Sequence, residues 1–232
     1  MEQVGAQRDL VAGLINIGFL EVMVGRFTDA ETTLARAQAL ADAIGAVRAQ
    51  TMATQNLALA VMYAGRGEDA LTLARTAEKM ARSQGSLCVA GAAAIYQARS
   101  LLVLGRAAEA RVEATRAVDT LSGMPPTLCY ALAVRAESEL VLERLELAAT
   151  AARALERLLD ELGSIDEGDA YARMVLARVL FARGDASEGA RVAKAGWARV
   201  EAAANGLSDT GARASFLAMP EHAALRRLAE AS

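Results

Sequence analysis

A short turn sequence recurs along this chain, and its recurrence limits the possible folds more than any other feature. Gly25-Arg26 opens the first copy, Gly65-Arg66 the second and Gly105-Arg106 the third, at intervals of about forty residues. Degenerate copies follow at Glu143-Arg144 and Gly184-Asp185. Self-similarity at a fixed period indicates a repeat architecture, in which each unit buries its apolar face against the next.

Each turn is flanked by segments with helical periodicity. Before the first turn, Leu10, Leu14 and Ile17 recur at the spacing of one helix face. After it, Thr28 and Glu31 have the spacing of a capping box, which predicts that a second helix starts there. A second glycine follows about twenty residues after each turn and predicts a helix stop, at Gly45, Gly85, Gly123, Gly163 and Gly206.

Each unit is therefore predicted to be helix, glycine turn, helix and glycine stop. The first helices are expected over 8–24, 47–64, 88–104, 126–142 and 168–183. The second helices are expected over 28–44, 68–84, 107–121, 145–162 and 186–204. Small residues at matching positions of the first helices let the two axes of a hairpin approach closely, and they are Gly18, Ala58, Ala98, Ala136 and Ala177. Matching residues on the second helices are Ala30, Ala70, Ala110, Ala148 and Ala190, and we expect Trp197 to fill core space further along the last one.

Composition narrows the class of protein and of partner. Hydrophobic residues make up 54% and aromatic residues only 4%, so we expect closely packed helices built from alanine and leucine. The net charge of −3 comes from interspersed charges without a basic run, which disfavours nucleic acid as a partner. No apolar run reaches the length of about 18 residues needed for a membrane span. The two cysteines make no disulfide framework, which predicts a reducing cytoplasm.

The pattern of small residue, glycine turn and alanine resembles the tetratricopeptide repeat (TPR), with each helix lengthened by nearly a turn. A period near forty also suits HEAT or armadillo repeats, but the positions of the small residues favour the TPR. The resemblance implies an all-α, right-handed α-solenoid of about five hairpins, over 8–46, 47–86, 87–124, 125–164 and 165–206. A lead-in at 1–7 and a pair of C-terminal capping helices within 207–232 complete the predicted organisation.

The tail carries a second resemblance. Arg213 to Leu217, Pro220, His222 and Leu225 to Ala229 are similar to the C-terminus of TPR arrays in large bacterial signalling proteins. In those proteins the array follows a protein kinase, a nucleotide cyclase or a STAND-type ATPase. The chain has no G-x-x-x-x-G-K-[ST] and no H-R-D motif, and its single histidine has no metal-ligand pattern beside it. We therefore expect no enzyme activity of its own and no cofactor or metal.

The TPR resemblance implies that the first helices line a concave groove for a protein or peptide segment. The polar and aromatic residues expected to face it are Asn16, Phe19, Gln55, Asn56, Tyr63, Tyr96, Arg99, Tyr130, Glu137, Tyr171 and Arg178. Tyrosine and arginine are typical anchors of interfaces. The side-chain amides of Asn16 and Asn56, at one position of consecutive repeats, offer a donor and an acceptor to a peptide backbone. Tyr63 and Tyr96 have the alternative role of packing between neighbouring helices.

Two functions follow. The first is a protein- or peptide-binding scaffold that acts in bacterial signal transduction. The alternative is a regulatory or effector-sensing module that controls a fused or associated kinase, cyclase or ATPase, through a covalently linked N-terminal signalling domain. Because no helix precedes the first one, Leu10, Leu14 and Ile17 lack a cover, which predicts a partner domain or self-association through the first repeat.

Overall fold

Helices account for all the regular secondary structure that the structure describes. The computed structural model describes residues 2–231, which form twelve α-helices and no strand. The helices group into two compact units, Met1–Gly105 (unit 1) and Arg106–Ser232 (unit 2). The unit boundary falls at the third copy of the recurring turn, within the array predicted from the sequence.

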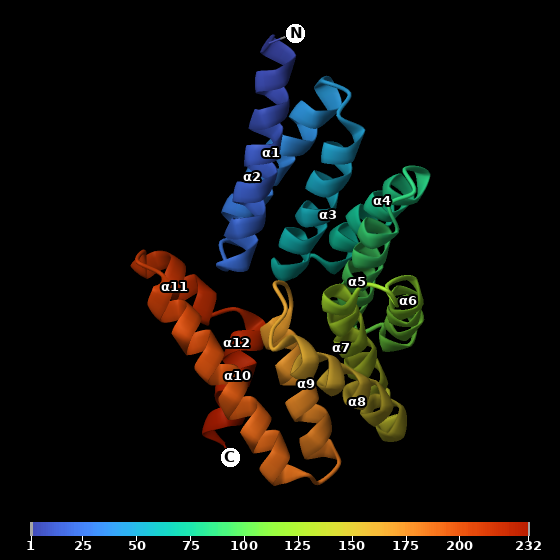
Figure 1. Cartoon of the computed structure of the whole chain (residues 1–232), viewed down its shortest axis with the longest axis vertical. Helices are drawn as coiled ribbons and strands as arrows, with labels where there is room; N and C mark the ends of the chain where they lie inside the picture. The colour runs from blue at the N-terminus through green and yellow to red at the C-terminus, as the bar shows by residue number, and fades with distance from the viewer. Residues whose placement is uncertain (1, 232) are drawn as a thin grey trace. The chain divides into compact units, whose positions relative to one another are not determined.

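Unit 1 is a run of five helices in which each helix packs against the next (Figure 1). They are α1 (Glu2–Met23), α2 (Phe27–Ala43), α3 (Val47–Tyr63), α4 (Gly67–Ser83) and α5 (Leu87–Val103). The first helices α1, α3 and α5 also contact one another in sequence, so they form one row and α2 and α4 a second. A core cluster between α1, α2 and α3 is small and aliphatic, with Val11, Leu14, Ile15, Ala37, Ala41 and Ala53.

Unit 2 continues the same pattern of packed hairpins (Figure 1). Its helices are α6 (Ala107–Thr120), α7 (Pro125–Val141), α8 (Leu145–Leu162), α9 (Asp169–Ala182), α10 (Ala186–Gly206), α11 (Thr210–Leu217) and α12 (Pro220–Glu230). The first helices α7 and α9 pack side by side, and α8 and α10 pack against them. Within each unit the consecutive packing of helical hairpins is that of an α-solenoid, as the sequence predicts.

Left-handed backbone at the first turn of each hairpin explains the recurring glycine. Gly25, Gly65, Gly105 and Gly184 have φ values of 77°, 81°, 73° and 86°, a region that residues with a Cβ rarely enter. In the fourth hairpin Glu143 takes this conformation instead, with φ of 59°. The turn geometry is therefore kept where the glycine is lost.

The second glycine of each hairpin follows the prediction only in part. Gly45, Gly85 and Gly163 have positive φ and follow the ends of α2, α4 and α8. Gly123 and Gly206 do not have positive φ, so the helix stops at these two positions do not use a left-handed glycine. The helix α6 has ended before Gly123, and Gly206 is itself the last residue of α10.

The small residues predicted on the first helices lie at tight crossings. All five, Gly18, Ala58, Ala98, Ala136 and Ala177, are buried. At Gly18 the approach is close, because an added Cβ would lie 2.5 Å from Cγ of Leu34 on α2. The last hairpin departs from the pattern, because Ala190 is only half-buried and so is Trp197. The prediction of Trp197 as a core residue is wrong, and the guanidinium of Arg226 lies 5.8 Å from its ring centroid.

The N-terminal hairpin differs from the prediction in two respects. Residues 1–7 were expected as a lead-in, but α1 begins at Glu2. The capping box is also wrong, since Arg26 is the N-cap of α2 and makes no side-chain cap hydrogen bond. The tight turn starts the helix directly after Arg26, whose carbonyl accepts a 2.9 Å hydrogen bond from the Ala30 N–H. Thr28 therefore lies within the first helical turn.

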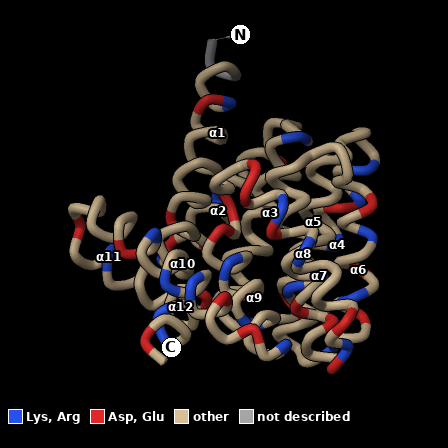
Figure 2. Tube along the Cα trace, turned by 60° about the horizontal axis from the view of Figure 1, so that its bottom comes forward, with Lys and Arg blue, Asp and Glu red and all other residues tan. Residues whose placement is uncertain are grey.

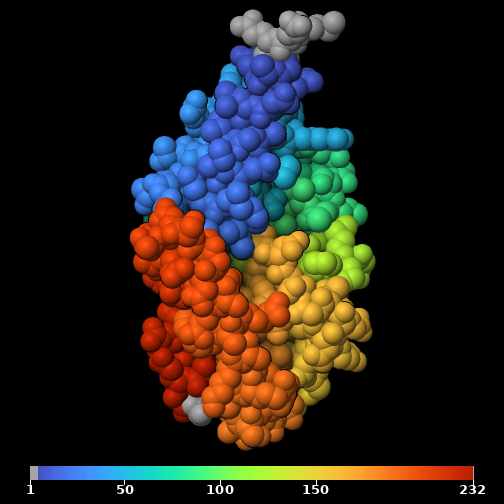
Figure 3. Space-filling model, turned by 60° about the vertical axis from the view of Figure 1, so that its left-hand side comes forward, coloured from blue at the N-terminus to red at the C-terminus, as the bar shows by residue number. Residues whose placement is uncertain are grey.

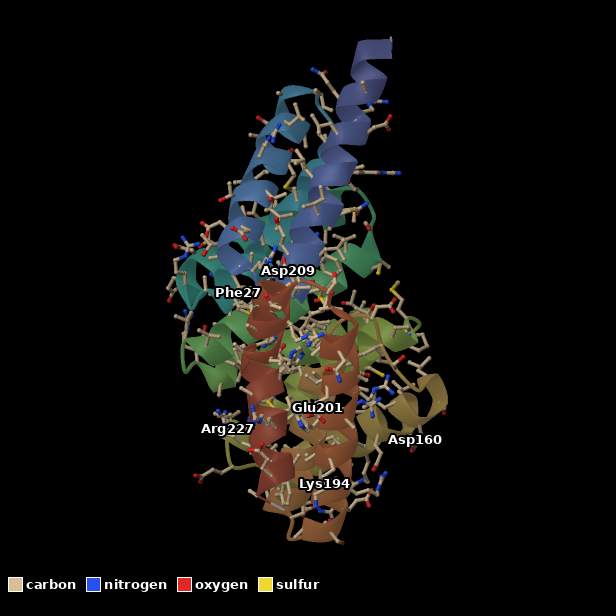
Figure 4. All side chains as sticks on the ribbon, turned by 90° about the vertical axis from the view of Figure 1, so that its left-hand side faces the viewer. Phe27, Asp160, Lys194, Glu201, Asp209 and Arg227 are labelled. Carbon is tan, nitrogen blue, oxygen red and sulfur yellow. The ribbon has the colours of Figure 1, made fainter. Side chains whose placement is uncertain are left out.

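The predicted capping pair at the C-terminus is present. The helix α11 follows Asp209 (Figure 4), whose carboxylate accepts hydrogen bonds from the N–H groups of Gly211 at 2.7 Å and Ala212 at 3.0 Å. These bonds satisfy two of the free donors of a helix start. The helix α12 packs against α9 and α10, and Leu225 fits over Gly196, where an added Cβ would come within 3.1 Å of it. The last hairpin is thereby covered by α12.

Within the described part of unit 1, no helix covers the outer face of α1. Leu10, Ile17 and Leu20 are 46%, 51% and 61% exposed, and α1 forms part of the molecular surface in Figure 3. The prediction is wrong for Leu14, which is 8% exposed and belongs to the core cluster.

Candidate functional site

The residues predicted to face a groove lie on the first helices of both units. Unit 1 holds Asn16, Phe19, Gln55, Asn56, Tyr63, Tyr96 and Arg99. Unit 2 holds Tyr130, Glu137, Tyr171 and Arg178. In each unit the structure brings some of them into contact and buries others.

In unit 1, Tyr63 is the centre of a three-residue cluster. Its ring stacks on Phe27, labelled in Figure 4, with the centroids 4.8 Å apart and the planes 5° from parallel. Arg99 donates a 2.9 Å hydrogen bond from Nη1 to the Tyr63 hydroxyl, and its guanidinium lies 5.0 Å from the centroid of that ring. A cation over an aromatic face is attracted by the ring quadrupole. The cluster therefore joins α2, α3 and α5, and Phe27 was not among the predicted residues.

In unit 2, Glu137 is the acceptor of a polar cluster between α7 and α9. Tyr171 donates a hydrogen bond to one of its carboxylate oxygens, and Arg178 donates one to the other. The rings of Tyr130 and Tyr171 meet edge to face, with the centroids 5.6 Å apart. The charges of Glu137 and Arg178 thus neutralise each other, so this arginine is already engaged within the protein.

Burial divides the predicted tyrosines. Tyr96, Tyr130 and Tyr171 are only 1%, 3% and 3% exposed. An added Cβ at Gly168 would lie 2.8 Å from the Tyr130 ring, which shows how closely the ring packs on that backbone. These three rings are core residues and offer little surface to a partner. Tyr63 is half-buried, so part of its ring remains accessible.

The two asparagines predicted to act together differ in their surroundings. Asn16 on α1 is exposed, whereas Asn56 on α3 is buried. The reason is the row of first helices, because α3 packs between α1 and α5 and α1 has one such neighbour. Phe19 and Gln55 are both half-buried.

Exposed residues that the sequence prediction missed join the predicted ones along the first helices of unit 1. Arg8, Arg48, Met52 and Val103 are all exposed. Arg48, Met52 and Val103 stand three or four residues from one another or from predicted residues on the same helix face. We define the unit 1 stripe as Arg8, Phe19, Arg48, Met52, Gln55, Tyr63, Arg99 and Val103. The signal was in the repeat, since Arg8 and Arg48 precede the turn glycines Gly25 and Gly65 by the same interval.

Two hollows adjoin this stripe. One, of about 410 Å³, is lined by Arg8 and Val11 of α1 and by residues 45–49 at the start of α3. The other, of about 370 Å³, is lined by Arg48, Thr51 and Met52 of α3, by residues 84–86 and by Val89 of α5. Arg48 borders both hollows, so its side chain stands between them.

Charges elsewhere are of both signs, and many of them are paired. In Figure 2 basic and acidic segments alternate along the helices of both units. Surface pairs such as Arg106–Glu109 and Arg191–Glu188 link neighbouring turns of one helix. Such exposed pairs contribute little to stability, about 0–1 kcal/mol each, and they indicate an ordinary solvated surface.

The remaining chemically reactive groups do not form a site. Cys88 is exposed on α5, and Cys129 is buried on α7, where burial raises the pKa of its thiol to about 11. Both cysteines are free. His222 is buried against Phe216, and its Nδ1 lies 2.6 Å from the Phe216 carbonyl oxygen. Among the described residues, no three His, Cys, Asp or Glu side chains are grouped as metal ligands.

Comparison with known proteins adds no relative to this picture. No protein-family model matches the chain, and no curated protein sequence matches it. Over residues 2–231, no helix has both the length and the apolar character needed to cross a bilayer.

Proposed function

We propose that this chain is a protein-binding scaffold and that it holds a protein or peptide segment along the unit 1 stripe. The observation that carries the proposal is the exposed apolar surface beside two hollows on one row of helices. Met52 lines one of the hollows and is 48% exposed. Further along the stripe Val103 is 51% exposed, and the ring of Tyr63 is partly accessible. Exposed apolar side chains that gather beside a hollow are typical of interaction sites.

Unit 1 is favoured over unit 2 as the binding surface, because the predicted contact residues of unit 2 are already engaged within the protein. In unit 2 the predicted contact residues are either buried rings or the pair of Glu137 with Arg178. In unit 1, Arg8 and Arg48 have no ion pair or side-chain hydrogen bond among the described residues. Charged groups without an internal partner remain available for a partner molecule.

The resemblances found in the sequence support the kind of scaffold and the cellular process that we propose. The repeat pattern supports a TPR-like scaffold, and the tail sequence from Arg213 to Ala229 supports a role in bacterial signal transduction in the cytoplasm. A scaffold of this kind holds a segment by many small contacts spread over several helices, since each repeat adds one pair of helices to the surface.

Affinity capture with matched variants tests the proposal. The purified chain is compared with a Met52→Glu, Val103→Glu variant of the unit 1 stripe in a lysate of the native host. The control is Val112→Glu, Leu147→Glu, which adds the same charges at positions of similar exposure, 54% and 48%, on the second helices α6 and α8. We expect a protein that the native chain and the control capture and that the stripe variant loses at least tenfold. Equal capture by all three chains, or no capture, would contradict the proposal.

A further inference from the structure

We propose that the unit 1 stripe selects acidic protein segments, through Arg8 and Arg48 at the two hollows between the first helices. This inference rests on the proposed function and adds the class of partner. The expected segment has acidic residues on both sides of an apolar residue. Its carboxylates meet the two guanidinium groups, and its apolar side chain packs against Val47 and Met52, which are 51% and 48% exposed.

The first step is the position of the two arginines. Arg8 on α1 and Arg48 on α3 hold the same place ahead of their turn glycines. Both line the hollow of about 410 Å³, so they face one space from neighbouring helices. Arg48 also borders the second hollow, of about 370 Å³. The repeat therefore places one arginine on α1 and one on α3 at matching positions.

The second step is the charge of the hollows. Among the residues that line them, Arg8 and Arg48 carry the only formal charges, and no acidic residue is present. Two acidic residues are close to these arginines in the sequence: Asp42 accepts a 2.9 Å hydrogen bond from Gln50, and Asp9, which follows Arg8, is exposed and does not line the hollow. By contrast, Arg99 is held by Tyr63 and Arg178 by Glu137. The two hollows therefore form a small positive surface on a chain whose net charge is −3.

The third step is the chemistry that fits such a surface. A guanidinium group is always charged and donates two parallel hydrogen bonds to a carboxylate. One exposed pair contributes only about 0–1 kcal/mol, so two arginines alone do not hold a segment. Apolar contact with Val47 and Met52, which line the same hollows and are 51% and 48% exposed, supplies the remaining affinity.

The fourth step is the spacing of the acidic residues. Packed helix axes lie about 8–10 Å apart, and an extended segment advances about 3.3 Å per residue with its side chains alternating in direction. Carboxylates that reach both arginines, with the apolar residue on the same side in between, therefore stand four residues apart. This spacing is a sequence pattern that a selection experiment can read directly.

A random twelve-residue peptide display library tests the inference, with the full chain as bait. The charge-reversal variant is Arg8→Glu, Arg48→Glu. The matched control is Arg36→Glu, Arg75→Glu, which changes the net charge equally at exposed arginines of the second helices α2 and α4 that have no partner among the described residues. Circular dichroism confirms that both variants keep their helicity. A third variant, Met52→Glu, removes the apolar contact.

We expect the native chain and the control to enrich peptides with paired Asp or Glu around an apolar residue. The charge-reversal variant should lose this enrichment at least tenfold. Peptides enriched without acidic residues, kept by the charge-reversal variant and lost by Met52→Glu, would overturn the inference and leave the proposed function standing. Enrichment of acidic peptides that is equal on all variants would also overturn it, as would a native chain that enriches no peptide, which would contradict the proposed function as well.

Discussion

Arg99 holds the Tyr63 ring from the neighbouring first helix, with a 2.9 Å hydrogen bond to its hydroxyl and its guanidinium 5.0 Å from the ring centroid. The contact joins α3 to α5, two helices that are far apart in the sequence and adjacent in the row of first helices. It fixes the aromatic end of the unit 1 stripe. The side chains there are thus held in place before any partner arrives.

A double-mutant cycle measures this contact. Tyr63→Ala and Arg99→Ala should each lower the free energy of unfolding, and together by less than their sum, with a coupling of about 0.5–1.5 kcal/mol. Urea unfolding followed by circular dichroism gives the four values. The Tyr63→Phe variant keeps the ring and loses the hydrogen bond, so it separates the two contributions. Strict additivity would contradict the contact.

Glycine substitutions test the packing of the first hairpin. An added Cβ at Gly18 would lie 2.5 Å from Leu34, whereas at Gly13 nothing lies within 4 Å. Gly18→Ala should therefore lower the free energy of unfolding by about 1–3 kcal/mol through overpacking. Gly13→Ala, on the same helix, should raise it by about 1 kcal/mol because alanine is the better helix former. Thermal unfolding of the two variants distinguishes them, and the same sign for both would contradict the crossing at Gly18.

The turn at Glu143 offers a test in the stabilising direction. Its φ of 59° places a residue with a Cβ in the left-handed region, at a cost of about 1–2 kcal/mol. Glu143→Gly should raise the free energy of unfolding by about 0.5–1 kcal/mol, once the greater freedom of glycine in the unfolded chain is subtracted. Arg157→Gly within α8 is the control and should lower it by about 1 kcal/mol. A destabilised Glu143→Gly protein would show that the side chain has another role.

The C-terminal cap should weaken in mild acid. Burial lowers the pKa of His222, although the Phe216 carbonyl and Glu221 act in the opposite direction. The unfolded chain therefore binds more protons than the folded one below the ordinary histidine pKa of about 6.5. The stabilisation is present above that pH and is lost as the pH falls through the lowered value. Hydrogen exchange of α12 at pH 7.5 and pH 5.5 should show this loss.

The His222→Gln variant is the control for the acid effect. Glutamine keeps a donor for the Phe216 carbonyl and does not titrate in this range. The difference in α12 exchange between the two pH values should shrink in the variant. Carboxylates such as Glu221 are unchanged in it. An unchanged difference would assign the pH dependence to those other groups.

The two cysteines should react at very different rates. Cys88 is exposed, and Cys129 is buried with its pKa raised to about 11, so few of its thiols ionise near neutral pH. A disulfide reagent such as Ellman's reagent at pH 7.5 should modify one thiol quickly and the second only after unfolding. The Cys88→Ala variant should show no fast reaction. Two fast thiols in the native chain would contradict the burial of Cys129.

The sequence predicts the helical framework well because turns and small residues leave a strong periodic signal. Gly25, Gly65 and Gly105 mark the turns directly, and even Glu143 keeps the expected backbone. The capping box failed at Thr28 because the tight turn starts the helix one residue after Arg26. A capping pattern such as that of Thr28 and Glu31 depends on local sequence alone, so it does not show at which residue after the turn the helix begins.

The candidate site is predicted less well, because exposure depends on which helices lie on each side. Tyr96 and Tyr63 both lie on first helices, yet the first is buried and the second is half-buried. Arg8 was missed although it is the first residue of the first helix predicted over 8–24. Once α1 is known to begin at Glu2, the repeat register places it beside Arg48.

Crosslinking from Cys88 tests the central claim most directly, and the chain offers this position naturally. Cys88 is exposed on α5, next to Val89 of the second hollow. Its thiol is labelled with benzophenone maleimide, and the labelled chain is added to host lysate and illuminated. The control carries the same label on α4, in a Cys88→Ala, Thr72→Cys variant. We predict a discrete protein crosslinked from Cys88, absent from the control and lost on Met52→Glu. The same crosslinked proteins from both positions, or none from Cys88, would contradict a binding surface along the first helices of unit 1.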